Sequence, residues 1–157
     1  RYFVEEVLHE SGNVGKIDEL TKRFSVLTRQ AIIDCPWVSG ATDFLDYFKE
    51  RLPLFLVSAT PQEELNKILD HRRIADYFQQ SYGAPLDKSE VLSVIMKDQE
   101  ASPVETLYIG DSPEDQQAAQ NQSIHFIGMD SGRGLKAKNL CSDFHKILQR
   151  VNSCYEC

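Results

Sequence analysis

Strand-like and helix-like patterns alternate over most of this chain. Four segments predict β-strands, at residues 54–57, 77–82, 106–109 and 124–127. A continuous apolar run such as 54–57 is typical of a strand that is buried on both faces. Apolar positions at helical spacing predict helices at residues 41–51, 61–71, 89–97 and 113–121, and a closing helix around residues 144–151. Strands separated by helices predict an α/β fold of Rossmann-like type, with a parallel sheet covered by helices on both faces.

The first 34 residues carry a helical pattern and no strand. The positions from Ile17 to Ala31 keep the three-four spacing of one helix, and breaks around Ser11–Asn13 and at Gly15 predict a hairpin with an earlier helix. A linker rich in turn residues follows at 35–40. We therefore predict a helical part at residues 1–35 and an α/β core at 36–157.

Composition excludes several classes of protein. The chain has 157 residues, of which 41% are apolar, and a net charge of −7. An acidic balance argues against nucleic-acid binding, and no apolar run approaches the ~18 residues of a membrane span. The four cysteines form no disulfide framework, and Cys154 and Cys157 lack the second ligand pair that a zinc site needs. We predict a cytoplasmic protein in a reducing compartment.

Candidate chemistry follows the predicted strands, because ligands of parallel α/β sheets bind beyond the carboxyl ends of the strands. Asp111 comes directly after one strand, and Asp115 lies four residues later, on the same side of the next helical turn. Two carboxylates at a strand end suit Mg²⁺. The same segment is also a sound helix start, with Ser112 as the N-cap and Asp115 as its capping-box partner. The spacing alone leaves both interpretations open.

Ser58 and Lys88 are weaker signals when each is taken alone. Ser58 ends a strand, and its hydroxyl and the amide of Ala59 could bind a phosphoryl oxygen, although serine is common in turns. Thr60 and Glu63 form a second potential capping box. Lys88 could be an ordinary solvated lysine. A hydroxyl, a lysine and a carboxylate pair in this order could together hold phosphate and a metal ion.

This constellation resembles the haloacid dehalogenase superfamily. Val57-Ser58, Lys88 and Gly110-Asp111-Ser112-Pro113-Glu114-Asp115 are similar to its second, third and fourth motifs, and the similarity covers about residues 36–130. The nearest group is that of the phosphoglycolate-phosphatase-like enzymes. The resemblance implies that residues 1–34 belong to a helical cap. It also implies that Ser58 and Ala59 bind the transferring phosphoryl group, that Lys88 stabilises its charge, and that Asp111 and Asp115 hold Mg²⁺.

The first motif of that family, Asp-x-Asp, is missing. No two of the chain's aspartates are separated by two positions, and no apolar strand precedes residue 36. In the family this motif ends a central strand that lies between the strands ending at Ser58 and Asp111. Without it these neighbours would lie two strand spacings, about 10 Å, apart. We expect a longer native protein, extended at its N-terminus by about 15–40 residues.

The sequence therefore predicts a Mg²⁺-dependent phosphatase acting on a small phosphorylated metabolite. An aspartate outside these residues would form an aspartyl-phosphate, so the chain alone should be inactive. Mutase chemistry stays open. The alternative is a non-catalytic interaction or regulatory protein on the same scaffold. A dinucleotide-binding domain is disfavoured, because no strand is followed by Gly-x-Gly-x-x-Gly.

Overall fold

The computed structural model describes residues 14–132 and 134–155. The first predicted helix of the hairpin, within residues 1–13, lies outside this range, as does Cys157. The elements are, in chain order, α1 (Val14–Asp34), α2 (Ala41–Phe48), β1 (Phe55–Pro61), α3 (Gln62–Arg72), the 3-10 turn Ala75–Tyr77, β2 (Gln80–Ala84), α4 (Lys88–Asp98), the 3-10 turn Pro103–Glu105, β3 (Leu107–Gly110), α5 (Pro113–Asn121), β4 (His125–Met129), β5 (Leu140–Cys141) and α6 (Phe144–Tyr155).

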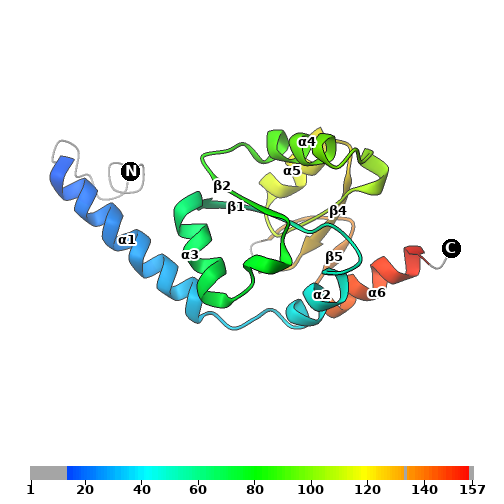
Figure 1. Ribbon diagram of the computed structural model, residues 1–157, viewed down its shortest axis with the longest axis horizontal. Coiled ribbons are helices and arrows are strands. Elements are labelled where there is room, and N and C mark those ends of the chain that lie inside the picture. The colour runs from blue at the N-terminus through cyan, green and yellow to red at the C-terminus, as the bar shows by residue number, and fades with distance from the viewer. Residues whose placement is uncertain (1–13, 133, 156–157) are drawn as a thin grey trace.

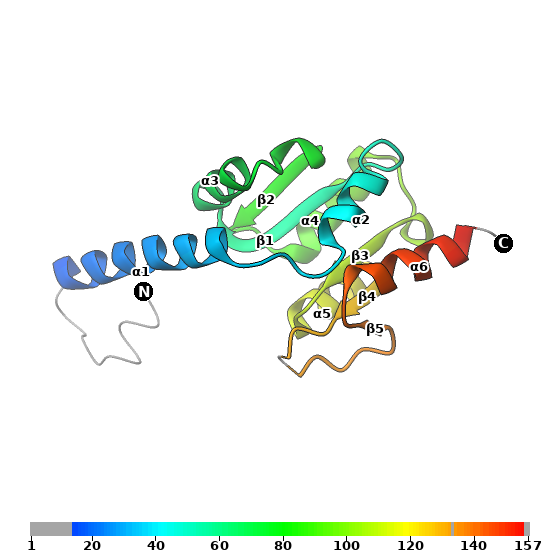
Figure 2. The same ribbon diagram turned by 90° about the horizontal axis from the view of Figure 1, so that it is seen from below.

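The strands form two separate parallel sheets (Figures 1 and 2). In the first, β1 pairs with β2, with Phe55 opposite Gln80. In the second, β4 pairs on one side with β3, Leu107 lying opposite His125, and on the other side with the short β5. All these pairs are parallel, as the alternation of strands and helices predicts. Strand β5 has only two residues, too few for a hydrophobic pattern to predict it.

Helices cover both faces of the three-stranded sheet. On one face, Ile127 and Met129 of β4 pack with Phe44 of α2 and Ile147 of α6. On the opposite face, Leu92 of α4 joins residues that share a second cluster, namely Ala118, Ala119, Ile124, Tyr108 and Phe126. The α/β architecture with helices on both faces is thereby confirmed.

Strand β1 differs from the prediction of a strand buried on both faces. Its residues are half-buried or exposed, and none is fully buried. The physical reason is its position at a sheet edge: within the described part of the chain, no ladder of hydrogen bonds joins β1 to β3. A cavity of about 870 Å³ is lined by both strands, including Val57 of β1 and Ile109 of β3. Within the described residues, this cavity therefore lies between β1 and β3.

Arg72 of α3 contacts the C-terminal end of α1 and the linker that follows it. Arg72 donates to the main-chain oxygens of Ile32 (2.7 Å) and Cys35 (2.9 Å), and its guanidinium lies 3.9 Å from the centre of the Trp37 ring. Carbonyl groups at the end of a helix lack partners within it, so a cation there stabilises the helix end. The predicted break at Gly15 is wrong, because α1 already begins at Val14.

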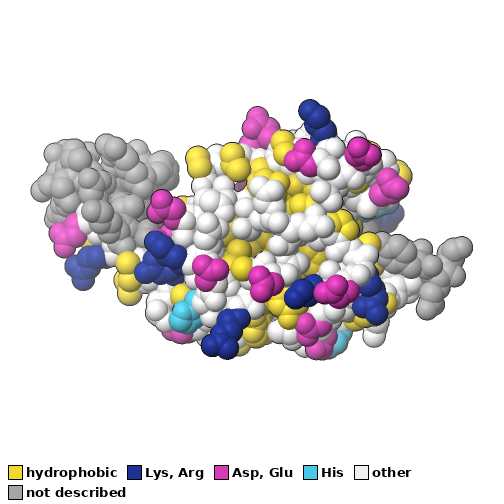
Figure 3. Space-filling view, in the orientation of Figure 1, with side chains coloured by type: hydrophobic (Ala, Val, Ile, Leu, Met, Phe, Trp, Pro, Cys, Tyr) yellow, Lys and Arg dark blue, Asp and Glu magenta, His cyan; other side chains and the backbone are white. Residues whose placement is uncertain are grey.

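Charged side chains of both signs are interspersed on the face shown in Figure 3, around exposed hydrophobic side chains. Leu27, which lies within the predicted amphipathic pattern from Ile17 to Ala31, is 69% exposed. In the part of the chain that the structure describes, no helix combines the length and apolar character required to traverse a bilayer.

Candidate active site

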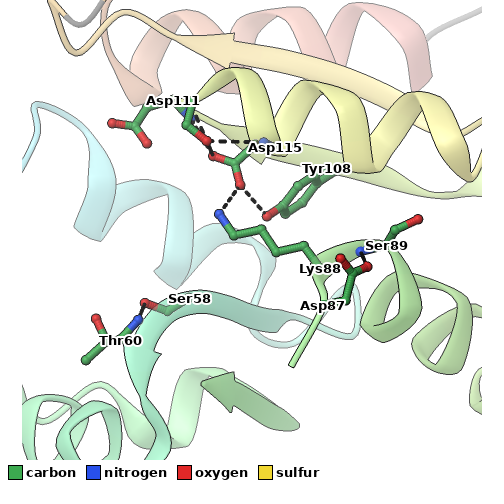
Figure 4. A network of polar contacts seen from close by, with 9 residues as sticks. Ser58, Thr60, Asp87, Lys88, Ser89, Tyr108, Asp111 and Asp115 are labelled. Carbon is green, nitrogen blue, oxygen red and sulfur yellow. Dashed lines mark hydrogen bonds and ion pairs between the residues drawn. The ribbon is translucent and has the colours of Figure 1, made fainter. Parts of the chain in front are cut away.

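The predicted site residues gather around the cavity between the two sheets. Its lining includes Ser58 and Ala59 within β1, Lys88 at the start of α4, and Asp111 and Asp115 beyond β3. Figure 4 shows Ser58 on one side, Asp111 and Asp115 on the other, and the side chain of Lys88 reaching toward Asp115. Residues that lie up to 57 positions apart in sequence thus share one cavity, which lies between strands of two different sheets.

Asp115 is the centre of the polar network. Its Oδ1 accepts hydrogen bonds from Lys88 Nζ (2.5 Å) and the Tyr108 hydroxyl (2.7 Å). Its Oδ2 accepts from the main-chain N–H groups of Asp111 (3.2 Å) and Ser112 (3.1 Å) and from the Ser112 hydroxyl (2.9 Å). The residue is only 5% exposed. A buried carboxylate is tolerated here because both oxygens have partners, including one cation.

These contacts determine the ionisation of Asp115 and Tyr108. Burial by itself raises the pKa of Asp115, but hydrogen bonds from Lys88, Tyr108 and Ser112 outweigh it and hold the pKa below its usual value. Burial, together with the hydrogen bond to Asp115, raises the pKa of Tyr108 far above its usual range. Asp115 is therefore the anion and Tyr108 a neutral donor at physiological pH.

The capping interpretation of Asp115 is confirmed. Ser112 is the N-cap of α5, Pro113 takes the first helical position, and the Ser112 hydroxyl accepts from the Asp115 N–H at 3.1 Å. Gly110 allows this close approach, since a Cβ there would lie 2.4 Å from the Asp115 Cβ.

The capping prediction for Thr60 is wrong. Helix α3 begins at Gln62, and its N-cap, Pro61, has no side-chain group that can accept a hydrogen bond.

Lys88 is not a solvated lysine. It is the first residue of α4, whose N-cap Asp87 accepts from the N–H of Ser89 at 2.8 Å. The Lys88 side chain is 23% exposed and paired with Asp115. An ammonium group has three N–H donors, and the bond to Asp115 uses one of them. Lys88 therefore retains donors for a ligand in the cavity.

Ser58 is also oriented by its own turn. Its Oγ accepts a hydrogen bond from the N–H of Thr60 at 3.1 Å. The prediction that Ser58 ends its strand is wrong, because β1 continues to Pro61, with an irregular register against β2 between Val57 and Pro61. Because the hydroxyl acts there as acceptor, its hydrogen can be donated to another group. Ala59 is exposed and lines the cavity.

The donors around the cavity can be compared with the needs of a magnesium ion. Mg²⁺ is usually bound by one or two carboxylates, water and substrate phosphate oxygens. Asp111 lines the cavity, and Figure 4 shows its carboxylate pointing away from Asp115. Across the described residues, no group of three or more His, Cys, Asp or Glu side chains could hold a metal ion. The residues present fit a site with few protein ligands, and direct coordination by Asp115 stays a prediction.

Three residues that the sequence reasoning missed belong to this cavity. Tyr108 precedes Asp111 by three positions in the strand, and a polar aromatic residue inside an apolar run was the available signal. Arg29 of α1 and Glu64 of α3 also line the cavity, where Arg29 NH1 donates to Glu64 Oε2 at 2.6 Å. No sequence pattern links these two, because they lie 35 positions apart.

Comparison with known families decides the relationship of the chain. The family model described as haloacid dehalogenase-like hydrolase matches residues 2–129. The chain belongs to the haloacid dehalogenase-like hydrolase family. The resemblance carried by Ser58, Lys88 and the Asp111–Asp115 segment is thus confirmed. A comparison with curated proteins finds no match.

Solved structures of haloacid dehalogenase-like hydrolases share the fold. A predicted phosphoglycolate phosphatase from Haemophilus somnus is 17% identical, with a TM-score of 0.80 over 94% of this chain and 72% of its own. A haloacid dehalogenase-like hydrolase from Streptococcus pneumoniae is 16% identical, with a TM-score of 0.73 over 94% of this chain and 76% of its own. A haloacid dehalogenase superfamily hydrolase from Geobacter sulfurreducens is 21% identical, with a TM-score of 0.66 over 77% of this chain and 59% of its own. The chain therefore spans about three fifths to three quarters of the length of these relatives.

Proposed function

We propose that the native protein is a Mg²⁺-dependent phosphatase acting on a small phosphorylated metabolite. One observation carries the proposal: Ser58, Lys88 and Asp111 line a single cavity although they come from β1, from α4 and from the turn after β3. The lining includes four carboxylates and only two cations. This excess of negative charge would repel a phosphate ester unless a metal ion neutralised it. Membership of a hydrolase family supports the same reaction class.

Each residue has a defined task in this proposal. Ser58 donates its hydroxyl hydrogen to an oxygen of the transferring phosphoryl group, and the Ala59 N–H binds beside it. Lys88 uses its remaining donors to stabilise negative charge that develops on that group. Asp115 positions Lys88 through the 2.5 Å ion pair. Asp111 would hold Mg²⁺, which supplies charge neutralisation and orients the phosphate. Asp115 would have to release one of its hydrogen bonds to act as a second ligand.

The nucleophile in this proposal is an aspartate outside the 157 residues. Its carboxylate attacks phosphorus, the ester P–O bond breaks, and the leaving oxygen takes a proton. Water then attacks the aspartyl-phosphate, which releases inorganic phosphate and restores the carboxylate. The half-exposed edge of β1 and the cavity that it shares with β3 support a strand in this position, because such edges otherwise keep unpaired main-chain groups.

The proposal is tested by measuring phosphatase activity of the 157-residue chain and of the protein made from its complete reading frame, each with Mg²⁺ and with a chelator. We expect turnover only from the complete protein and only with Mg²⁺. Far-UV and near-UV circular dichroism of each form checks that it is folded. Robust turnover by the 157 residues alone would refute an external nucleophile, and turnover in excess chelator would refute the metal requirement.

A non-catalytic regulatory protein on the same scaffold is the second candidate. The missing Asp-x-Asp pair favours it. It predicts that the complete reading frame also lacks this pair, so the coding sequence upstream of Arg1 separates the two functions before any assay is made.

A further inference from the structure

Tyr108 of β3 joins the hydrophobic core to the polar network of the cavity. Its ring packs against the core cluster that contains Leu92, and the centre of the ring lies 6.2 Å from that of Phe126. Tyr108 also lines the cavity, and its hydroxyl donates to Asp115 Oδ1 at 2.7 Å. No step of the proposed phosphatase reaction uses this hydroxyl.

Tyr108 and Lys88 share one oxygen of Asp115. Lys88 Nζ donates to the same Oδ1 at 2.5 Å, so that the hydroxyl and the ammonium group converge on it (Figure 4). A carboxylate oxygen has two lone pairs that can accept hydrogen bonds. The tyrosine occupies one of them, and the lysine is left with the other. The direction from which Lys88 approaches Asp115 is therefore set by Tyr108.

The two donors differ in stiffness. The ammonium group of a lysine sits on a flexible four-carbon stem, whereas the side chain of a tyrosine has only two torsions. The backbone of Tyr108 is held by the parallel ladder in which it lies opposite Phe126. The other carboxylate oxygen of Asp115 accepts from the main-chain N–H groups of Asp111 and Ser112. Rigid donors on both oxygens thus fix the plane of the carboxylate to which Lys88 binds.

We propose that Tyr108 is a positioning residue for phosphoryl transfer, whose hydroxyl orients the Asp115 carboxylate and confines Lys88 to one position on it. Without the hydroxyl, the ammonium group gains a second position on Oδ1, and the fraction of molecules in which Lys88 is correctly placed for the phosphoryl group falls. A tyrosine hydroxyl is neutral at physiological pH, so it orients Lys88 without adding negative charge to the cavity. This inference rests on the proposed phosphatase function.

The test is Tyr108→Phe in the protein made from its complete reading frame, assayed with p-nitrophenyl phosphate and Mg²⁺. Phenylalanine keeps the ring in the core and removes only the hydroxyl. We expect kcat to fall by about tenfold to a hundredfold, because a hydrogen bond to a charged group is lost. KM should stay within about threefold, since Lys88 acts chiefly on charge that develops in the transition state. The Mg²⁺ concentration that gives half the maximal rate should not change.

Tyr82→Phe is the matched control, because it makes the same change in another strand. Tyr82 lies in β2 and does not line the cavity. Its substitution should leave kcat and KM within about twofold. Urea denaturation of both variants verifies that each is folded.

Two results with Tyr108→Phe would overturn the inference. If Tyr108 serves only the packing of the core, the variant behaves like the control, because its ring is retained. If the end of β3 is distorted instead, kcat, KM and the Mg²⁺ requirement all change together. Only a loss confined to kcat indicates that Lys88 is misplaced.

Failure of the proposed function gives a different result from failure of this inference. If the phosphatase function is wrong, the complete wild-type protein shows no Mg²⁺-dependent turnover of p-nitrophenyl phosphate, and the inference is refuted with it. If only the role of Tyr108 is wrong, the wild-type protein is active and Tyr108→Phe gives one of the two contrary results.

Discussion

Replacement of Asp115 by alanine is expected to lower the free energy of unfolding by about 3–5 kcal/mol. The variant leaves the Lys88 ammonium and the Tyr108 hydroxyl without their common acceptor in a largely buried site. It also removes the acceptor of two main-chain N–H groups at the start of α5. Urea denaturation at pH 7, followed by circular dichroism, measures the change.

The control is Asp87→Ala, which removes another aspartate at the start of a helix. Asp87 is the exposed N-cap of α4 and accepts from the N–H groups of Ser89 and Glu90. Loss of a cap of this kind costs about 1 kcal/mol. If Asp115→Ala costs no more than this control, the ion pair with Lys88 contributes nothing to stability and the network described above is wrong.

The ion pair of Asp115 with Lys88 makes the free energy of unfolding depend on pH in one direction. The pKa of Asp115 is lower in the folded protein than in the unfolded chain, where it is about 3.9. Its contribution is therefore fully present above the unfolded-state pKa, and is lost as the pH falls through the folded-state pKa. The stability difference between wild type and Asp115→Asn should shrink below about pH 4. A difference that grows on acidification would contradict the assigned sign.

Replacement of Asp111 by asparagine is expected to reduce Mg²⁺-dependent turnover of the complete protein by about a thousandfold or more. The estimate follows because metal stabilisation of a phosphoryl transition state is worth several kcal/mol. Because the change substitutes an amide for a carboxylate of the same shape, stability should change little. Initial rates measured over a range of Mg²⁺ concentrations, at saturating substrate, give both the maximal rate and the metal affinity.

Asp130→Asn is the matched control for this variant. Asp130 follows β4 as Asp111 follows β3, but it is exposed and its carboxylate accepts the N–H of Gly132 at 3.1 Å. The cavity lining does not include it. Its substitution should leave turnover and Mg²⁺ dependence within about twofold. Equal losses for the two variants, or an Asp111→Asn enzyme that remains fully active, would refute the metal role of Asp111.

The hydrophobic periodicity of the sequence predicted the bounds of the helices better than the burial of the strands. Helix α5 begins and ends at the predicted residues, because Ser112 and Pro113 define its start through local chemistry. Strand β2 begins at Gln80 rather than residue 77, since a 3-10 turn occupies Ala75–Tyr77. The burial of β1 could not be predicted from its own apolar run. Burial depends on a neighbouring strand, and within the described residues β1 has a ladder partner on one side only.

The candidate site, too, could be predicted only in part from the sequence. Ser58, Lys88, Asp111 and Asp115 could be found from the sequence, because strand ends converge in parallel sheets and their order resembles a known family. The contacts that organise them could not. The pairing of Lys88 with Asp115 and the contact of Arg29 with Glu64 join different elements, and each depends on tertiary packing. Tyr108 was missed because one residue serves both as a strand side chain in the core and as a donor to Asp115.

In the proposed function, Ser58, Lys88 and Asp111 serve a nucleophilic aspartate supplied by a strand outside the 157 residues. The most direct measurement quenches the complete protein during turnover with Mg²⁺, reduces any acyl-phosphate with borohydride, and locates the modified aspartate by mass spectrometry. We predict a single modified aspartate upstream of Arg1, whose yield falls in the Asp111→Asn variant. A modified aspartate within residues 1–157, or steady turnover without any acyl-phosphate, would contradict the proposed external nucleophile.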